Sequence, residues 1–249
     1  MRRLYRSGCF HSVPAVFLLL ICLSANFVFS QELRFNHITT ENGLSQTSAQ
    51  CVFEDSKGFI WIGTQDGLNR YDGYGITIFK HNPVDNNSLS NNFVSDVMED
   101  RDGMLWIATS GGGLDSYEAA THRFSHHMAD SSGKNAISSD IVWKLFEDKA
   151  GLIWICTEDG LNTYDKKTGK FNVFRHDPDK EGTISCNAVY DILQDKSGFL
   201  WIATMGGGLN CMHPASGKFR SFGLQPEDFP KLYSLKMDLA TLALAIRKV

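Results

Sequence analysis

The stretch GFIWIGTQDGLNRYDG, residues 58–73, occurs four times in this chain in closely related form. The tryptophans of successive copies are separated by 45, 48 and 47 residues. A period of about 40 to 50 residues is typical of repeat proteins, in which each unit buries its apolar face against the next. The four tryptophans are Trp61, Trp106, Trp154 and Trp201.

The composition is that of a globular protein, with 43% hydrophobic and 21% charged residues in 249. The first thirty residues differ from the rest, because three arginines precede the apolar run Val13–Leu23. Residues 28–30, VFS, followed by Gln31, then place small or aliphatic residues at the positions that a signal peptidase recognises. We predict a secretory signal peptide over residues 1–30, cleaved between Ser30 and Gln31, and therefore a periplasmic location.

Two other interpretations of this segment are less well supported. A membrane anchor would need about 20 apolar residues, whereas the uninterrupted run Val13–Leu23 has 11. A lipoprotein anchor at Cys22 is disfavoured because the bulky Ile21 precedes it. No later run is long and apolar enough to span a bilayer, so we expect no membrane span after signal removal.

Removal of residues 1–30 takes away three arginines and no acid, which leaves 21 basic and 28 acidic side chains and a formal charge of −7. This balance disfavours nucleic acid as a partner. Four cysteines remain, and their spacing matches no metal motif. Although an exported compartment permits disulfides, we expect Cys51, Cys156, Cys186 and Cys211 to be unpaired, with Cys51 and Cys156 as small core residues.

Each repeat predicts four short strands. The first ends in an aspartate, and a four-residue turn closed by glycine leads to the second, tryptophan-containing strand. The second strand is apolar on both faces, as expected of a strand buried between two sheets. The predicted strands are 49–55, 60–64, 68–72 and 75–81; 94–100, 105–109, 114–118 and 122–127; 142–148, 153–157, 161–165 and 170–177; and 189–195, 200–204, 209–213 and 218–222.

The aspartates that open these turns are predicted to be structural, because an aspartate side chain can bond the backbone two residues on. A calcium-loop interpretation of the DRDG turn is disfavoured, since Met98 stands where a further oxygen ligand is needed and the later glutamate is missing. We therefore predict no metal site. The four turn aspartates are Asp55, Asp100, Asp148 and Asp195.

Four-stranded antiparallel units stacked face to face are the blades of a β-propeller. We predict an all-β fold of about four blades in a partial or open ring, with a signal helix before it and a possible helix in the divergent tail, residues 224–249. Leu33, Phe35 and Ile38 resemble a stray fourth strand that would complete the last blade. An open arc would expose strand edges, so self-association is expected.

The pattern ED..G.[IL]WI.T..GL..YD, with NNSLSNNFVSDV between copies, resembles the two-component regulator propeller repeat over about residues 32–223. That repeat is found in the periplasmic sensor of hybrid two-component systems, especially in Bacteroidetes. The resemblance implies a non-catalytic propeller domain, residues 31–223, that senses a small ligand, commonly an oligosaccharide, for a phosphorelay. Family members carry more repeats, a β-sandwich domain, a transmembrane helix, a histidine kinase, a receiver and a DNA-binding regulator. No kinase motif is present here, so we expect a truncated or frame-disrupted member without kinase activity.

Two kinds of loop could contact a ligand. The turns after the second strands of copies two and four carry three glycines, which permit close approach of a ligand or another backbone, or simply lengthen the turn. The interblade segments, residues 81–92, 126–140 and 176–187, are rich in side chains that bond sugar hydroxyls but also suit solvated turns. Candidate ligand-binding residues are Gly111, Gly112, Gly113, Gly206, Gly207, Gly208, Asn91, Asn92 and Asn187.

No catalytic constellation stands out. His126 and His127 are adjacent on a predicted strand and point to opposite faces, which makes them poor joint metal ligands. No cofactor is predicted. Two other classes remain open: a protein-interaction scaffold, and a propeller lyase or quinoprotein-like enzyme, which would need clustered catalytic or cofactor-binding side chains at the channel mouth.

Overall fold

The computed structural model describes residues 35, 37–130 and 135–222. The chain divides into two compact units, Met1–His37 and Ile38–Val249, and all described strands belong to the second. The predicted signal peptide, Leu33 and the tail at 224–249 lie outside the described residues. Within the described ranges, no helix combines the length and hydrophobicity needed to cross a membrane.

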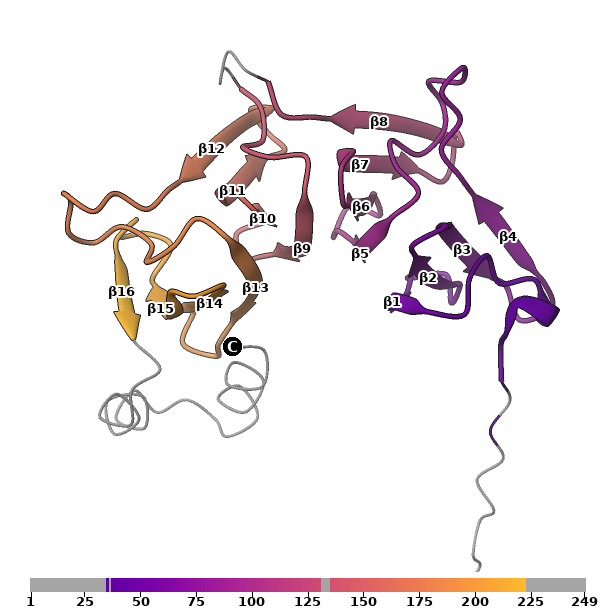
Figure 1. Cartoon of the computed structure of the whole chain (residues 1–249), viewed down its shortest axis with the longest axis horizontal. Coiled ribbons are helices and arrows are strands. Elements are labelled where there is room, and N and C mark those ends of the chain that lie inside the picture. Colours follow the sequence, from indigo (N-terminus) through magenta and orange to yellow (C-terminus); the bar gives the residue numbers. More distant parts are fainter. Residues whose placement is uncertain (1–34, 36, 131–134, 223–249) are drawn as a thin grey trace, which may run out of the picture. The chain divides into compact units, whose positions relative to one another are not determined.

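The second unit contains four antiparallel sheets of four strands each, in which spatial order follows chain order. The predicted all-β architecture of four blades is therefore confirmed. In Figure 1 the first strand of each sheet lies innermost and the fourth outermost. A short 3-10 helix, η1 (Thr40–Asn42), precedes the first sheet. The sheets are β1 (Ala49–Glu54), β2 (Ile60–Thr64), β3 (Gly67–Tyr71) and β4 (Ile76–Phe79); β5 (Val94–Glu99), β6 (Leu105–Thr109), β7 (Gly113–Glu118) and β8 (Arg123–His127); β9 (Val142–Glu147), β10 (Ile153–Thr157), β11 (Gly160–Asp165) and β12 (Lys170–Phe174); and β13 (Val189–Gln194), β14 (Leu200–Thr204), β15 (Gly208–Met212) and β16 (Phe219–Phe222).

The second strands have the predicted bounds, whereas other strands differ slightly. Each first strand ends one residue before its aspartate, because that side chain belongs to the turn. The prediction of a stray strand that completes the last blade is wrong for the described residues. Phe35 and Ile38 lie outside any strand, and β13–β16 already form a complete sheet.

Each sheet is fastened at its first turn by the same aspartate–tryptophan contact. Asp148 Oδ1 accepts hydrogen bonds from the amides of Ala150 (2.8 Å) and Leu152 (3.0 Å), and Oδ2 accepts one from Trp154 Nε1 (2.9 Å). A single carboxylate thus both closes the turn and orients the indole. Corresponding indole–carboxylate bonds join Trp61 to Asp55 (2.8 Å), Trp106 to Asp100 (2.8 Å) and Trp201 to Asp195 (3.0 Å).

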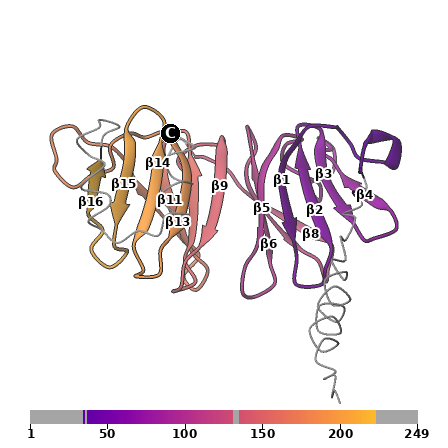
Figure 2. The same cartoon turned by 90° about the horizontal axis from the view of Figure 1, so that it is seen from below.

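The oriented tryptophans pack each sheet onto the next. Three apolar clusters contain Trp61 with Val94, Trp106 with Val142, and Trp154 with Val189, so each joins consecutive sheets. Contacts also run from β1 to β5, from β5 to β9 and from β9 to β13. Figure 2 shows the strands side-on, with their connections gathered at two opposite ends. The second strands are buried on both faces, as the sequence predicts.

One polar contact of the second sheet differs from the equivalent contact in the other sheets. In the third sheet, Asn162 accepts a hydrogen bond from the Ser138 amide (2.9 Å) and donates one to its hydroxyl (2.7 Å). Asp115 takes the place of this asparagine, accepts a bond from the Ser90 amide (2.9 Å) and lies 2.7 Å from His126 Nδ1. The hydrogen bond to Asp115 raises the pKa of His126 above its ordinary value, although partial burial opposes the rise.

The stability that this histidine contributes is expected to be lost as pH rises. Because the pKa of His126 is higher in the folded state than its ordinary 6.5, the contribution is fully present below pH 6.5 and declines as pH passes through the raised value. Asp115→Asn copies the other sheets and should flatten this dependence. Thermal midpoints measured from about pH 5 to 9 check this, and parallel profiles for the two proteins would contradict it.

Candidate ligand-binding site

Both kinds of predicted ligand-contacting loop lie at the same end of the sheets. The Gly67 amide at the β2–β3 turn donates to the Asn92 carbonyl (2.8 Å), and the Gly160 amide donates to the Asn187 carbonyl (2.7 Å). In the second sheet, the Gly113 amide donates to the Asp140 carbonyl (2.9 Å). Each interblade segment is therefore tied to the turn of the sheet that precedes it.

The candidate asparagines also hold these segments internally. Asn92 Oδ1 accepts a hydrogen bond from the His81 amide (2.7 Å), and Asn187 Oδ1 accepts one from the His176 amide (2.7 Å). Asn91 Oδ1 accepts one from the Phe93 amide two residues on (2.9 Å). The structure thus gives all three side chains a role in shaping the loops.

The glycine turns allow the chain to approach itself closely. A Cβ on Gly112 would lie 2.5 Å from Ser90 Oγ, and one on Gly207 would lie 2.6 Å from Ser185 Oγ. At Gly113, where φ is +79°, it would lie 2.5 Å from the His127 carbonyl oxygen. Gly206, by contrast, faces open space. The other two candidate glycines, Gly111 and Gly208, also have positive φ, at 109° and 76°.

A cavity of about 280 Å³ lies among the first strands of the four sheets. It lies near the starts of these strands, and Ala49 at the start of β1 pairs with Thr64 at the end of β2. The cavity is therefore near the end that carries the glycine turns and interblade segments. All four repeats contribute to its lining, which comprises Gln50, Cys51, Val52, Phe93, Ser95, Asp96, Trp143, Lys144 and Tyr190.

One repeat position supplies much of the cavity wall. The residues eleven places before the four repeat tryptophans are Gln50, Ser95, Trp143 and Tyr190. The rings of Trp143 and Tyr190, on adjacent sheets, have centroids 5.6 Å apart and an interplanar angle of 33°. Tyr190 is 41% exposed, so this aromatic pair is accessible to a ligand.

The residues that follow Ser95 and Trp143 on the same strands, Asp96 and Lys144, carry the charges of the cavity lining. Lys144 Nζ lies 2.8 Å from Asp96 Oδ1, and Asp96 Oδ2 accepts a hydrogen bond from the Leu145 amide (2.9 Å). Burial raises the pKa of Asp96, and the Lys144 ammonium opposes that rise. Burial lowers the pKa of Lys144, but the charge of Asp96, the hydrogen bond to it and the charge of Asp191 together outweigh burial and raise the pKa. At Cys51, burial raises the thiol pKa to about 12, so this cysteine stays protonated and unreactive.

These lining residues are not among the predicted ligand contacts, because the sequence pattern of the first strands indicates only a structural role. An available signal was variation at one aligned position, where the chain carries Gln50, Ser95, Trp143 and Tyr190 inside otherwise similar repeats. The cysteine prediction is confirmed for the described structure: Cys51, Cys156, Cys186 and Cys211 are free. Cys156 is fully buried, and Cys51 is partly buried.

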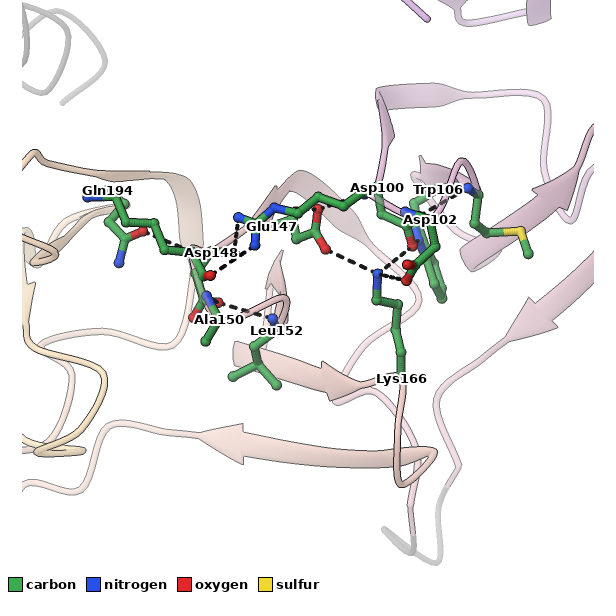
Figure 3. Close-up of polar contacts among 12 residues, drawn as sticks. Asp100, Asp102, Trp106, Glu147, Asp148, Ala150, Leu152, Lys166 and Gln194 are labelled. Atoms are coloured by element: carbon green, nitrogen blue, oxygen red, sulfur yellow. Dashed lines mark hydrogen bonds and ion pairs between the residues drawn. The ribbon is translucent and has the colours of Figure 1, made fainter. Parts of the chain in front are cut away.

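A second polar cluster joins the second and third sheets near their first turns. Figure 3 shows the ammonium of Lys166 pointing toward three carboxylates. Its distances are 3.0 Å to Asp100, 2.6 Å to Asp102 and 3.1 Å to Glu147. Burial lowers the pKa of Lys166, but hydrogen bonds to these carboxylates raise it above its ordinary value. Among the residues that the structure describes, no cluster of His, Cys, Asp and Glu side chains suits a metal ion.

A family model described as two component regulator propeller matches residues 43–66, 88–111, 136–159 and 183–206. Each match includes the first two strands of one sheet and the start of the turn that follows. Each of the four sheets contains a two-component regulator propeller repeat. A curated relative, Histidine kinase P4 of Formosa agariphila, is 40% identical over 65 residues, which are 26% of this chain and 4% of that protein.

Solved structures share the architecture of these two-component regulator propeller repeats. The extracellular domain of BT3049, assigned to a hybrid two component system of B. thetaiotaomicron, superposes with a TM-score of 0.69 at 23% identity, over 78% of this chain and 27% of that one. The extracellular domain of BT4673 from B. thetaiotaomicron, assigned to a one component system, gives 0.61 at 25%, over 76% and 28%. Virginiamycin B lyase of Staphylococcus aureus gives 0.51 at 13%, over 71% and 56%, which shows a shared fold alone. The chain thus spans about a quarter of the length of the two extracellular domains.

Proposed function

We propose that these repeats form part of the ligand-sensing region of an exported two-component sensor. The ligand site is the cavity among the first strands of the four sheets, here called the central cavity. The repeat family and the similarity to extracellular domains support the sensor assignment. The observation that carries the site is the cavity itself, because all four repeats line it and it exposes the paired rings of Trp143 and Tyr190. A ligand bound there would contact every sheet and could change how they pack.

We infer that the ligand is an oligosaccharide. Aromatic faces suit the apolar faces of sugar rings, while Gln50 and the Asp96–Lys144 pair offer hydrogen-bond donors and acceptors for hydroxyl groups. The cavity, at about 280 Å³, is at the lower limit for a drug-sized ligand. We therefore expect a terminal sugar ring to enter and the remainder to lie along the glycine turns, where Gly206 faces open space.

Oligosaccharide titration of the whole chain, followed by thermal unfolding, tests this proposal. A ligand that binds only the folded state raises the thermal midpoint. Trp143→Ala should weaken binding by at least about tenfold, as truncation of a central aromatic contact commonly does. Tyr74→Ala provides a matched aromatic deletion, because Tyr74 is fully exposed in the β3–β4 turn, and it should bind like the wild type.

The possible outcomes test the class of the ligand and the location of its binding site separately. If the folded chain shows no shift with any sugar, the oligosaccharide assignment is wrong. If a sugar binds Trp143→Ala as well as the wild type, the ligand lies outside the cavity. Binding of a protein with no small ligand would favour the scaffold alternative.

We propose a non-catalytic role for the cavity. Its titratable lining groups among the described residues are Cys51, Asp96, Lys144 and Tyr190. Asp96 and Lys144 form an ion pair, and Cys51 remains protonated. This set provides binding groups but no uncommitted general base near neutral pH.

A further inference from the structure

A separate pocket of about 340 Å³ lies beside Trp106, between the second and third sheets. Its position near the first turn distinguishes it from the central cavity, with which it shares no lining residue. The second sheet contributes Trp106, Ser116, Ser125 and His127, and the third contributes Tyr164 and Lys166.

Two small residues leave this space beside the indole. Trp106 pairs across the sheet with Ser116, which in turn pairs with Ser125 on the outermost strand. Ser116 is only 8% exposed, so the pocket extends to an interior part of the sheet. In the third and fourth sheets, Thr163 and Cys211 stand opposite the repeat tryptophan.

The first sheet fills the corresponding place with a guanidinium group. Arg70 pairs with Trp61 just as Ser116 pairs with Trp106. The Arg70 Cζ atom lies 5.9 Å from the centre of the Trp61 ring and 4.9 Å from that of Phe59. A planar cation over an indole face is a favourable arrangement, strongest where water is partly excluded.

The charges around the Trp106 pocket also favour a cation. Among the charged residues that line it, Asp100 and Asp102 supply two carboxylates and Lys166 one ammonium, while nearby Glu147 is shared between Lys166 and the Arg101 guanidinium, 3.8 Å away. The Asp102 side chain is 74% exposed, so one carboxylate is accessible to solvent. Burial lowers the pKa of His127, which stacks on Trp106, so this ring adds no positive charge at neutral pH.

We propose that the pocket beside Trp106 binds a guanidinium group, stacked on the indole as Arg70 is on Trp61 and paired with Asp102. In the first sheet, Arg70 of the protein itself occupies this place. In the second sheet, where Ser116 leaves the place open, the guanidinium group belongs to a ligand. This site is independent of the sugar-binding cavity.

The first test uses the whole chain with methylguanidinium, and N-methylurea as a neutral molecule of nearly the same shape. The indole N–H resonance of Trp106 reports on the pocket. We expect methylguanidinium to shift it in a saturable manner, with an affinity at least about tenfold higher than that of N-methylurea. Equal affinities, or no shift in the folded chain, would overturn the proposal.

Two variants locate the binding. Ser116→Arg gives the second sheet the residue of the first, and should reduce methylguanidinium binding by at least about tenfold, because the chain's own guanidinium then fills the pocket. Asp102→Asn removes a largely exposed carboxylate together with its ion pair to Lys166, and should weaken binding about threefold even if the arginine variant fails to fold. Ser216→Arg adds an exposed arginine elsewhere and should bind like the wild type. Unchanged binding in both Ser116→Arg and Asp102→Asn would place the site elsewhere.

The reverse substitution, made in the first sheet, tests the comparison between the surroundings of Trp61 and those of Trp106. Arg70→Ser opens the space over Trp61, so methylguanidinium should raise its thermal midpoint more than that of the wild type, while N-methylurea should not. Equal effects of the two molecules would overturn the comparison.

The tripeptide Gly-Arg-Gly then distinguishes two sources of the guanidinium group. Tighter binding than methylguanidinium supports an arginine side chain of a peptide, and weaker binding supports a small guanidinium compound.

Discussion

Asp148→Ala is expected to lower the free energy of unfolding by about 3 kcal/mol. Asp148 is 2% exposed and accepts hydrogen bonds from Ala150, Leu152 and Trp154. Its removal leaves three donors without their acceptor, one of them on a buried indole. Each such loss costs about 1 to 3 kcal/mol when the donor stays buried, and partial access of water to the turn reduces the total.

Urea unfolding measures this effect as a lower midpoint at an unchanged slope. Asp66→Ala is the matched control, since Asp66 is about half exposed and its ion pair with Lys80 lies at the surface. Such pairs contribute about 0 to 1 kcal/mol, so this variant should remain close to the wild type. Similar unfolding free energies for the two variants would show that the turn aspartate does not hold the blade together.

Lys166→Met is expected to cost about 2 kcal/mol at neutral pH. The variant keeps a side chain of similar length but leaves Asp100 and Asp102 without their cation, while Glu147 retains only the Arg101 guanidinium, 3.8 Å away (Figure 3). The Asp100 side chain is fully buried, and that of Glu147 is 9% exposed, so water can compensate these charges only in part. Solvent access at Asp102 keeps the expected loss below that of a fully buried pair.

The pH dependence distinguishes charge from packing in this prediction. Burial alone would raise the pKa of Asp100, but the hydrogen bonds it accepts from Trp106, Lys166 and the Met104 amide, with the charge of Lys166, together hold the pKa below the ordinary value. The wild type therefore loses this contribution as pH falls through the lowered pKa, whereas the variant gains stability when its carboxylates are protonated. The difference in unfolding free energy should narrow toward about pH 4. Lys167→Met is the exposed control, and a pH-independent difference for Lys166→Met would indicate lost packing instead.

The blade architecture could be predicted because its signals are local and repeated. Every copy contains a turn like that from Asp148 to Gly151 and an apolar strand like that around Trp154. Each copy therefore supports the same secondary-structure prediction for the others. The stray strand was predicted from apolar spacing alone. The structure shows Ile38 outside any strand and the fourth sheet complete without it, because β16 occupies the outermost position.

The candidate sites were harder to predict, because the relevant side chains come from different sheets. The interblade asparagines and glycine triplets stood out by composition, yet Asn92, Asn187 and Gly113 bond or crowd neighbouring backbone. Trp143 and Tyr190 stood out less, since an aromatic residue in a strand usually indicates a core. Only their equivalent positions in adjacent repeats indicate that they face the same cavity.

The sequence by itself determined the blades: their number, their strand and turn positions, and the aspartate and tryptophan that begin each one. These features depend on residues a few positions apart, so backbone geometry and apolar pattern specify them directly. Tertiary structure alone decided which side chains meet across blades. Asp96 with Lys144 and Lys166 with Asp100 are 48 and 66 residues apart, and the gap beside Trp106 exists only where the third sheet adjoins Ser116. Such contacts depend on how one sheet stacks on the next, a geometry that no single repeat encodes.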